Sequence, residues 1–349
     1  MKTKNLATMY AIVAAVLYAV NVPFSKLLLN HVAPTIMAAF LYLGAGLGMF
    51  GYHITAKKLG KVSPTERLTR KELPYTISMI VLDIIAPILL MFGIRSCHAA
   101  NVSLINNFEI VATSMIALFI FRESISTRLW LAIILVTVAS VILSFEGEGA
   151  FVFNSGSLYI LGACLCWGIE NNCTRMISNK SSFEIVIIKG TFSGLGSLLV
   201  AILLQEQLPH VLWIVWVLLL GFVSYGLSIY FYVMAQKDLG AAKTSAYYSI
   251  APFMGVVFGM LVLGERPAIQ FYIALAIMGI STYFMIKDSI ELQHTHEHHH
   301  THIHEHSHGD LVHSHKHTHT HTHIHIHGED SECHRHDHQS MSHDHSHET

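Results

Sequence analysis

The segment LINNFEIVATSMIALFIF, residues 104–121, is an apolar run of helix length that carries one carboxylate, Glu109. On a helix that turns by 100° per residue, Asn106 and Thr113 fall within about 60° of Glu109, so the three form a polar stripe. A charged side chain at the centre of a membrane helix costs about 2.5–3.5 kcal/mol on insertion scales. Glu109 is therefore expected to face protein or water, where it can load and unload a proton.

The composition is that of a polytopic membrane protein. The 349 residues are 52% hydrophobic and 13% charged, whereas soluble domains are about 25% charged. Residues 1–290 hold 19 Lys and Arg against 13 Asp and Glu, while residues 291–349 hold 2 against 10, together with 23 of the 27 histidines. The chain thus divides into a basic membrane part and an acidic, histidine-rich tail.

Ten apolar runs approach the length of about 20 residues that a spanning helix needs. If the N-terminus is cytoplasmic, 15 Lys and Arg fall on cytoplasmic segments and two, Arg95 and Arg266, on outer segments. This bias follows the positive-inside rule. We therefore predict an all-α membrane protein with ten spans and both termini in the cytoplasm. The predicted spans are residues 7–28, 34–54, 74–94, 99–121, 128–145, 157–174, 184–204, 211–235, 242–263 and 269–286.

The two halves of the membrane part resemble each other in sequence. Residues 18–26 (YAVNVPFSK) align with residues 167–175 (WGIENNCTR) at an offset of 149, and Ala99-Ala100 recurs as Ala241-Ala242 at an offset of 142. Because each half holds five spans, an odd number, the halves are predicted to lie in the membrane in opposite orientations. Inverted repeats are typical of secondary transporters, with the site near the midplane. The predicted domains are residues 1–150, 151–290 and the tail, 291–349.

Several residues occur at matching places in the two halves. Lys26 and Arg175 close the first span of each half, Glu123 and Glu265 close the fourth, and Pro252 lies within SIAPF in the second half. In these features residues 4–288 resemble the EamA-type permeases of the drug/metabolite transporter superfamily. The resemblance implies a ten-helix transporter, with export as the expected direction. In one respect the chain departs from the family: Ile110, preceded by Glu109, replaces the proline of the first half, so a proline-broken helix is not expected there.

Further ionisable residues interrupt the apolar spans. Asp83 lies four residues before Pro87, and Glu170 occupies the repeat position of Asn21. Lys189 needs a counter-charge, which Glu109, Asp83 or Glu170 can supply. A static ion pair or a polar contact between helices is the alternative for each of these groups. The predicted solute or proton pathway comprises Glu109, Asn106, Asp83, Glu170 and Lys189, with the aromatic repeat mates Tyr18 and Trp167, for which simple packing is the alternative.

The tail alternates histidine with Thr, Ser, Ile or Glu. It lacks the apolar content to fold alone, so disorder is predicted. Because neutral imidazole binds Zn, Ni and Co, we expect a flexible multisite metal buffer or sensor; a passive solubilising tail is the alternative. Two HExxH matches do not indicate a protease, since that motif needs a stable helix. The predicted ligands are His296, His298, His300, His302, His304, His306, His308, His313, His315, His317, His319, His321, His323, His325 and His327.

The favoured function is secondary transport of a small solute across a bacterial inner membrane by alternating access. The sequence contains no GxxxxGK[ST] phosphate-binding loop, and no nucleophile–base pair suggests an enzyme. Two alternatives stay open: a transporter of a divalent transition metal, and a membrane-anchored metal sensor without transport. The expected partners are the solute and the lipid bilayer. A homodimer is compatible with the sequence, and no nucleic acid is expected as a partner. No cofactor is required, although the tail is expected to bind Zn, Ni or Co.

Overall fold

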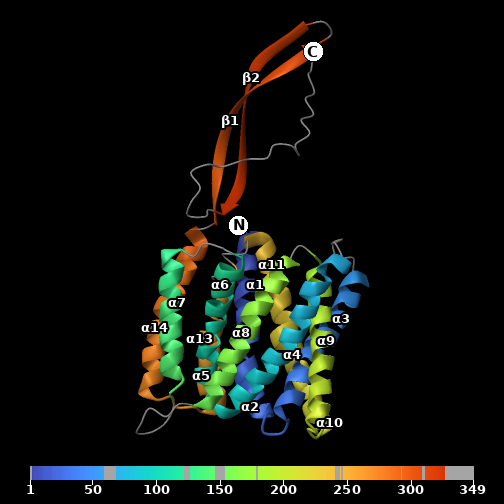
Figure 1. Ribbon diagram of the computed structural model, residues 1–349, viewed down its shortest axis with the longest axis vertical. Helices are drawn as coiled ribbons and strands as arrows, with labels where there is room; N and C mark the ends of the chain where they lie inside the picture. The colour runs from blue at the N-terminus through green and yellow to red at the C-terminus, as the bar shows by residue number, and fades with distance from the viewer. Residues whose placement is uncertain are drawn as a thin grey trace. The chain divides into compact units, whose positions relative to one another are not determined.

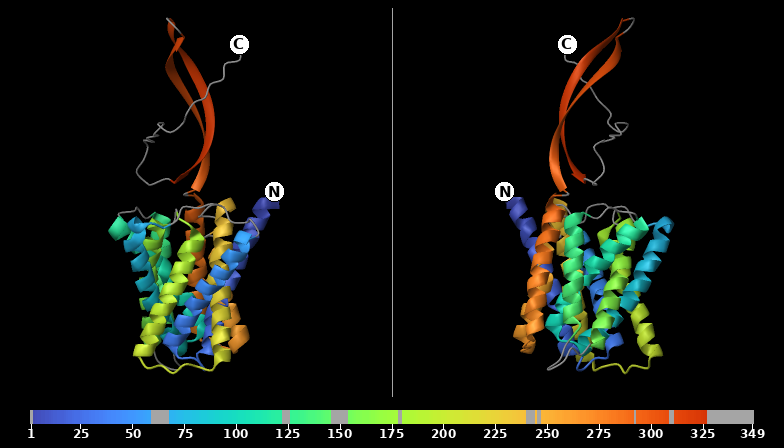
Figure 2. Two further views of the ribbon diagram at one scale, coloured as in Figure 1. Left: turned by 90° about the vertical axis from the view of Figure 1, so that its right-hand side faces the viewer. Right: turned by 60° about the vertical axis from the view of Figure 1, so that its left-hand side comes forward.

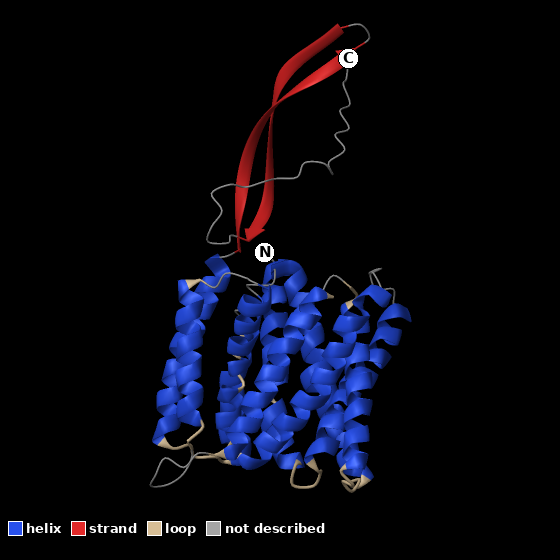
Figure 3. Cartoon of the chain, viewed as in Figure 1, coloured by secondary structure: helices blue, strands red, loops and turns tan. Residues whose placement is uncertain are grey.

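The computed structural model describes residues 2–58, 68–121, 126–145, 154–177, 180–239, 244, 247–291, 293–308 and 311–326. It separates into two compact units, residues 1–291 and 292–349, and Figure 3 shows that the first is helical and the second contains the strands. The repeat residues Glu123 and Ala241-Ala242 and the predicted ligand His327 lie outside the described residues.

The predicted spans fall on helices throughout the described part of the first unit (Figure 1). Among these residues, seven helical segments are long and apolar enough to cross a membrane, and two shorter apolar helices, α7 and α13, accompany them. The first half contains α1 (Lys2–Ala19), α2 (Asn21–Leu28), α3 (Pro34–Lys58), the short η1 (Arg70–Glu72), α4 (Leu73–Ser96), α5 (Ala99–Ile105), α6 (Phe108–Phe121) and α7 (Thr127–Leu143). The second half contains α8 (Ser155–Met176), α9 (Ser182–Leu203), α10 (Val211–Gly221), the π-helical η2 (Phe222–Leu227), α11 (Ser228–Leu239), α13 (Ala251–Leu263) and α14 (Ile269–Glu291).

The fourth span is broken even though it lacks the family's proline. Helix α5 ends at Ile105 and α6 begins at Phe108, and the amides of Glu109 and Ile110 bond to carbonyls three residues back, at 3.1 and 3.0 Å. The intervening Asn106-Asn107 pair explains the break, because asparagine favours turns over helix interiors. The absence of the proline therefore does not make this span one continuous helix. Discontinuous helices of this kind build the sites of many transporters.

Glycines allow helices of the two halves to come into close contact. Helix α3 packs against α9 and α4 against α8. A Cβ on Gly46 would lie 2.6 Å from the Thr191 nitrogen, and one on Gly190 would lie 2.5 Å from the Gly46 nitrogen. Only glycine allows two helix backbones to approach so closely. This approach holds α9, and with it Lys189, against the first half.

The outer surface of the helical unit is apolar. The side chains of Phe119, Leu203 and Leu261 are 73%, 73% and 76% exposed. In an ordinary soluble protein such a surface would be unfavourable, whereas lipid matches it. Figure 2 shows the helices running side by side in a bundle, as expected for a polytopic membrane protein.

The described part of the tail is a β-hairpin. Strand β1 (Gln293–His308) pairs antiparallel with β2 (Leu311–Ile326), with Gln293 opposite Ile326. For the rest of the tail, which lies outside the described residues, disorder stays a prediction. Within the hairpin, histidine recurs at every second position, and Thr, Ile and Val occupy many of the places between. Period-2 alternation with β-branched residues is a strand pattern, although the composition indicates disorder.

Candidate functional site

Three buried charges from three helices meet in the helical unit. The Nζ atom of Lys189 on α9 lies 3.0 Å from Oδ2 of Asp83 on α4 and 3.0 Å from Oε1 of Glu170 on α8. The side chains of Asp83 and Glu170 are 0% and 1% exposed, and that of Lys189 is 19% exposed. Asp83 and Glu170 thus supply the predicted counter-charge. We call Asp83, Glu170 and Lys189 the ion cluster; it joins the two halves, since Asp83 belongs to the first half.

Neutral donors complete the ion cluster. The Tyr42 hydroxyl and the Trp167 indole nitrogen both donate to Oδ1 of Asp83, at 3.0 and 3.2 Å, and the Thr174 hydroxyl donates to Oε1 of Glu170. Buried charges are tolerated when they are paired and hydrogen-bonded in this way. Trp167, for which the sequence left a place in the pathway or simple packing open, is buried and donates to Asp83 in this conformation.

Glu109 faces α8. The Asn171 side-chain amide donates to Oε1 of Glu109 at 2.7 Å and to the Thr113 hydroxyl at 3.2 Å. The predicted stripe thus continues from Glu109 to Thr113, while Asn106, beyond the helix break, accepts a long hydrogen bond from the Cys164 thiol. A helical wheel does not apply across that break. Asn171 thus joins α8 to α6, although nothing in an isolated helix shows which neighbour it meets.

Four tyrosines extend from the ion cluster toward α1. The Tyr42 ring lies 5.4 Å from that of Tyr225, and the Tyr18 ring lies 6.0 Å from Tyr225 and 5.9 Å from Tyr248. Asn21 donates its side-chain amide to the Tyr225 hydroxyl at 3.0 Å. Rings with polar tips suit solutes that have both apolar and polar parts. Of these residues the sequence predicted only Tyr18. Tyr225 could have been found as the repeat mate of Asp83, because it follows Asp83 at the repeat offset of 142 residues.

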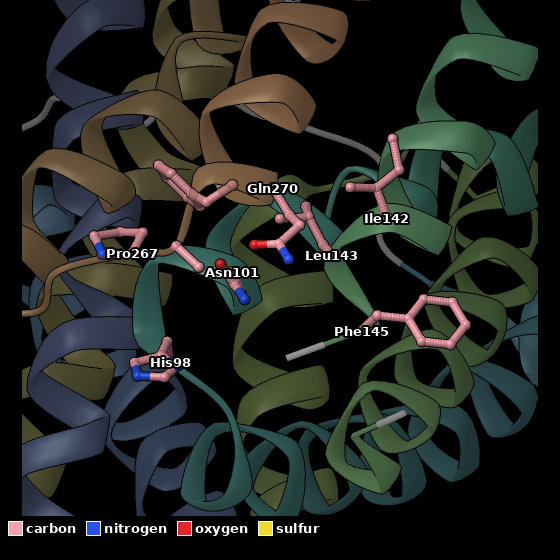
Figure 4. A pocket seen from close by; sticks show the side chains of 9 residues that line it. His98, Asn101, Ile142, Leu143, Phe145, Pro267 and Gln270 are labelled. Carbon is pink, nitrogen blue, oxygen red and sulfur yellow. The ribbon is translucent and has the colours of Figure 1, made fainter. Parts of the chain in front are cut away.

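Two cavities lie near the ends of the helices, and neither is lined by the ion cluster or by Glu109. One, of about 50 Å³, lies between His98, Asn101, Gln270 and the end of α7 (Figure 4). The other, of about 420 Å³, is lined by residues that include Lys26, Arg95 and Glu265. In this conformation the carboxylates of the ion cluster are enclosed, so exposing them to either side requires helices to move.

Comparison with known proteins identifies the family. The EamA-like transporter family matches residues 5–145 and again residues 154–287. The chain belongs to the EamA-like transporter family. This membership places the chain in the drug/metabolite transporter superfamily, as the sequence resemblance indicated. The chain is therefore a multi-pass membrane protein of a family that transports small solutes. The tail lies outside both matches.

Individual relatives agree with this assignment. An uncharacterized transporter of Methanothermobacter thermautotrophicus is 23% identical over 276 residues, which cover 73% of this chain and 78% of the relative. A solved crystal structure covers 82% of this chain and 97% of its own, with a TM-score of 0.60 and 16% identity. At that identity the solved structure shows the shared fold alone.

Proposed function

We propose that this EamA-like protein is a secondary transporter that moves a small solute by alternating access between its two halves, with export as the favoured direction. The observation that carries the proposal is the ion cluster, which is buried and shared by both halves. When one half rocks against the other, the Lys189–Asp83 pair has to break or re-form. A ligand that binds one arrangement of this pair better than the other shifts the equilibrium between the two states.

The charges of the site suit coupling to protons. The ion cluster holds two carboxylates around one ammonium group, so protonating either carboxylate removes one ion pair. Glu109 is a further carboxylate that meets the opposite half, through Asn171. We assign Glu109 to proton or solute binding, and we assign Asn106, Tyr18 and the members of the ion cluster, with Trp167, to the pathway.

The same geometry supports an organic solute over a divalent metal. Lys189 places a fixed positive charge between Asp83 and Glu170, where a metal ion would need those carboxylates as ligands. Within the side chains that the structure describes, no group of three or more His, Cys, Asp and Glu residues is placed to hold a metal ion. A metal transporter would instead need hard or nitrogen ligands gathered along its pathway.

We place the protein in a bacterial inner membrane with both termini in the cytoplasm. The support is the distribution of Lys and Arg among the segments between spans. Single cysteines introduced at Asn30 and Lys58, near opposite ends of α2 and α3, would test the orientation. A membrane-impermeant maleimide added to intact cells should label position 30 and spare position 58; the reverse pattern would overturn this topology.

Transport is tested with purified protein in proteoliposomes. A thermal-shift screen against metabolites and amines selects the solute, and counterflow is then measured across a pH series. Glu109→Gln should flatten the pH dependence while leaving the fold intact, because a glutamine oxygen still accepts from Asn171. Glu72→Gln, which neutralises an acid in η1, is the matched control and should retain the wild-type pH profile.

Two results would count against this assignment. No flux of any selected solute would remove the transport proposal. Wild-type pH dependence in the Glu109→Gln protein would remove the role of Glu109 and leave the ion cluster as the coupling site.

A further inference from the structure

The register of the tail hairpin places histidines directly opposite histidines. The even-numbered residues from 294 to 306 pair with the odd-numbered residues from 313 to 325, and all fourteen are histidine. The pairs between them combine residues such as Thr301 with Thr318 and Ile303 with Lys316. Because a strand repeats every two residues, the seven histidine pairs occupy one face of the hairpin. We call each such pair a rung.

The spacing of the rungs suits transition-metal ions. Directly opposite residues in an antiparallel pair have Cβ atoms about 4.5–5.5 Å apart, and consecutive rungs are separated by about 6.7 Å along the strand. Structural zinc sites take four ligands, and zinc lies about 2.0–2.1 Å from an imidazole nitrogen. Two successive rungs supply four histidines, which is the number of ligands that one such ion needs. Imidazole suits Zn, Ni and Cu, whereas Mg and Ca prefer oxygen.

We propose that residues 293–326 form a hairpin that binds several divalent transition-metal ions, with the paired histidines of the rungs as ligands. This site goes beyond the proposed transport function and does not depend on it. A two-stranded hairpin is marginally stable in water. Ions that join the strands across each rung bind the paired form and therefore stabilise it.

Pairing can be separated from histidine content with two variants that each lose six histidines. The rung-breaking variant carries His→Asn at the even-numbered residues from His296 to His306, so it keeps one complete rung. The rung-keeping variant carries His→Asn at His302, His304, His306, His313, His315 and His317, so it keeps four consecutive rungs. Both retain the residues of the helical unit, and both should elute from a sizing column like the wild-type protein.

The measurement is zinc bound per chain, by equilibrium dialysis of metal-stripped, full-length protein in detergent against micromolar ZnCl2. A chain that ends at Glu291 supplies the background of the helical unit. The rung-keeping variant should retain about half or more of the zinc bound by the tail, and the rung-breaking variant should lose most of it. Equal losses in the two variants would show that composition and not pairing governs binding, and full-length protein that binds no more zinc than the truncated chain would exclude the site altogether. Either result overturns the proposal.

Discussion

Two contacts between the halves occupy repeat-related positions but differ in chemistry. Glu170 and Asp83 meet through the ammonium group of Lys189. Their repeat mates, Asn21 at an offset of 149 and Tyr225 at an offset of 142, are joined directly by a hydrogen bond of 3.0 Å. One contact is charged and the other is neutral, although the same pair of repeat positions builds both.

Because only one of the two contacts is charged, we expect them to respond differently to pH. Asn21 and Glu170 each lie a few residues past the middle of their span, the first and the sixth. Because these spans run in opposite directions, we expect the two contacts on opposite sides of the membrane midplane. In an inverted repeat, motion that opens one end closes the other. Only the charged contact contains carboxylates. Protonation is thus expected to loosen one end of the pathway and to leave the other unchanged.

The largest effect is expected when the cation of the charged contact is removed. Lys189→Met keeps an unbranched side chain but leaves two buried carboxylates without their partner. Removing one member of a buried ion pair costs about 3–5 kcal/mol. The thermal unfolding midpoint in detergent should fall sharply, and solute counterflow should be lost.

Two further variants check this explanation. Lys189→Arg keeps the positive charge and should unfold close to the wild-type midpoint. Adding Glu170→Gln to Lys189→Met removes one of the unpaired carboxylates and should recover part of the loss. An unchanged midpoint in Lys189→Met would show that the ion cluster contributes nothing to the fold.

A smaller effect, on the pH profile of transport, is expected from Asp83→Asn. The amide oxygen still accepts from Tyr42 and Trp167, but the ion pair with Lys189 is lost at every pH. The variant therefore mimics a protonated Asp83. Its counterflow at neutral pH should resemble that of the wild-type protein in acid, and its pH profile should be flatter; a profile of wild-type shape would exclude Asp83 from proton coupling.

Much of the charged contact could be predicted from the sequence. Asp83, Glu170 and Lys189 stand out because ionisable groups are rare within apolar spans, and the need of Lys189 for a counter-charge limits its partners to a few carboxylates. The ten spans could be predicted because the apolar runs have the length and hydropathy of membrane helices. The choice of Asp83 and Glu170 over Glu109 depends on how α4, α8 and α9 pack, which no single span reveals.

The neutral contact could not be predicted in this way. Tyrosine is an ordinary residue in a membrane helix, so Tyr225 and Tyr42 gave no signal of their own. Tyr225 becomes visible only when the repeat alignment is extended from Asp83. In the tail, composition and periodicity point to different structures, since the low apolar content indicates disorder and the alternating histidines have the period of a strand.

The smallest effect is expected at the neutral contact. Tyr225→Phe removes the hydroxyl that accepts from Asn21 while keeping the ring that packs against Tyr18 and Tyr42. The loss of one buried hydrogen bond costs about 1–3 kcal/mol when the donor is left unpaired. The unfolding midpoint should fall slightly, and the pH profile of counterflow should keep its wild-type shape, because no titrating pair has been removed.

Asn21→Ala combined with Tyr225→Phe isolates the bond: the double variant should lose less stability than the sum of the two single variants. A changed pH profile in Tyr225→Phe would show that the neutral contact also takes part in proton coupling. The proposal that only the charged contact responds to pH would then be wrong.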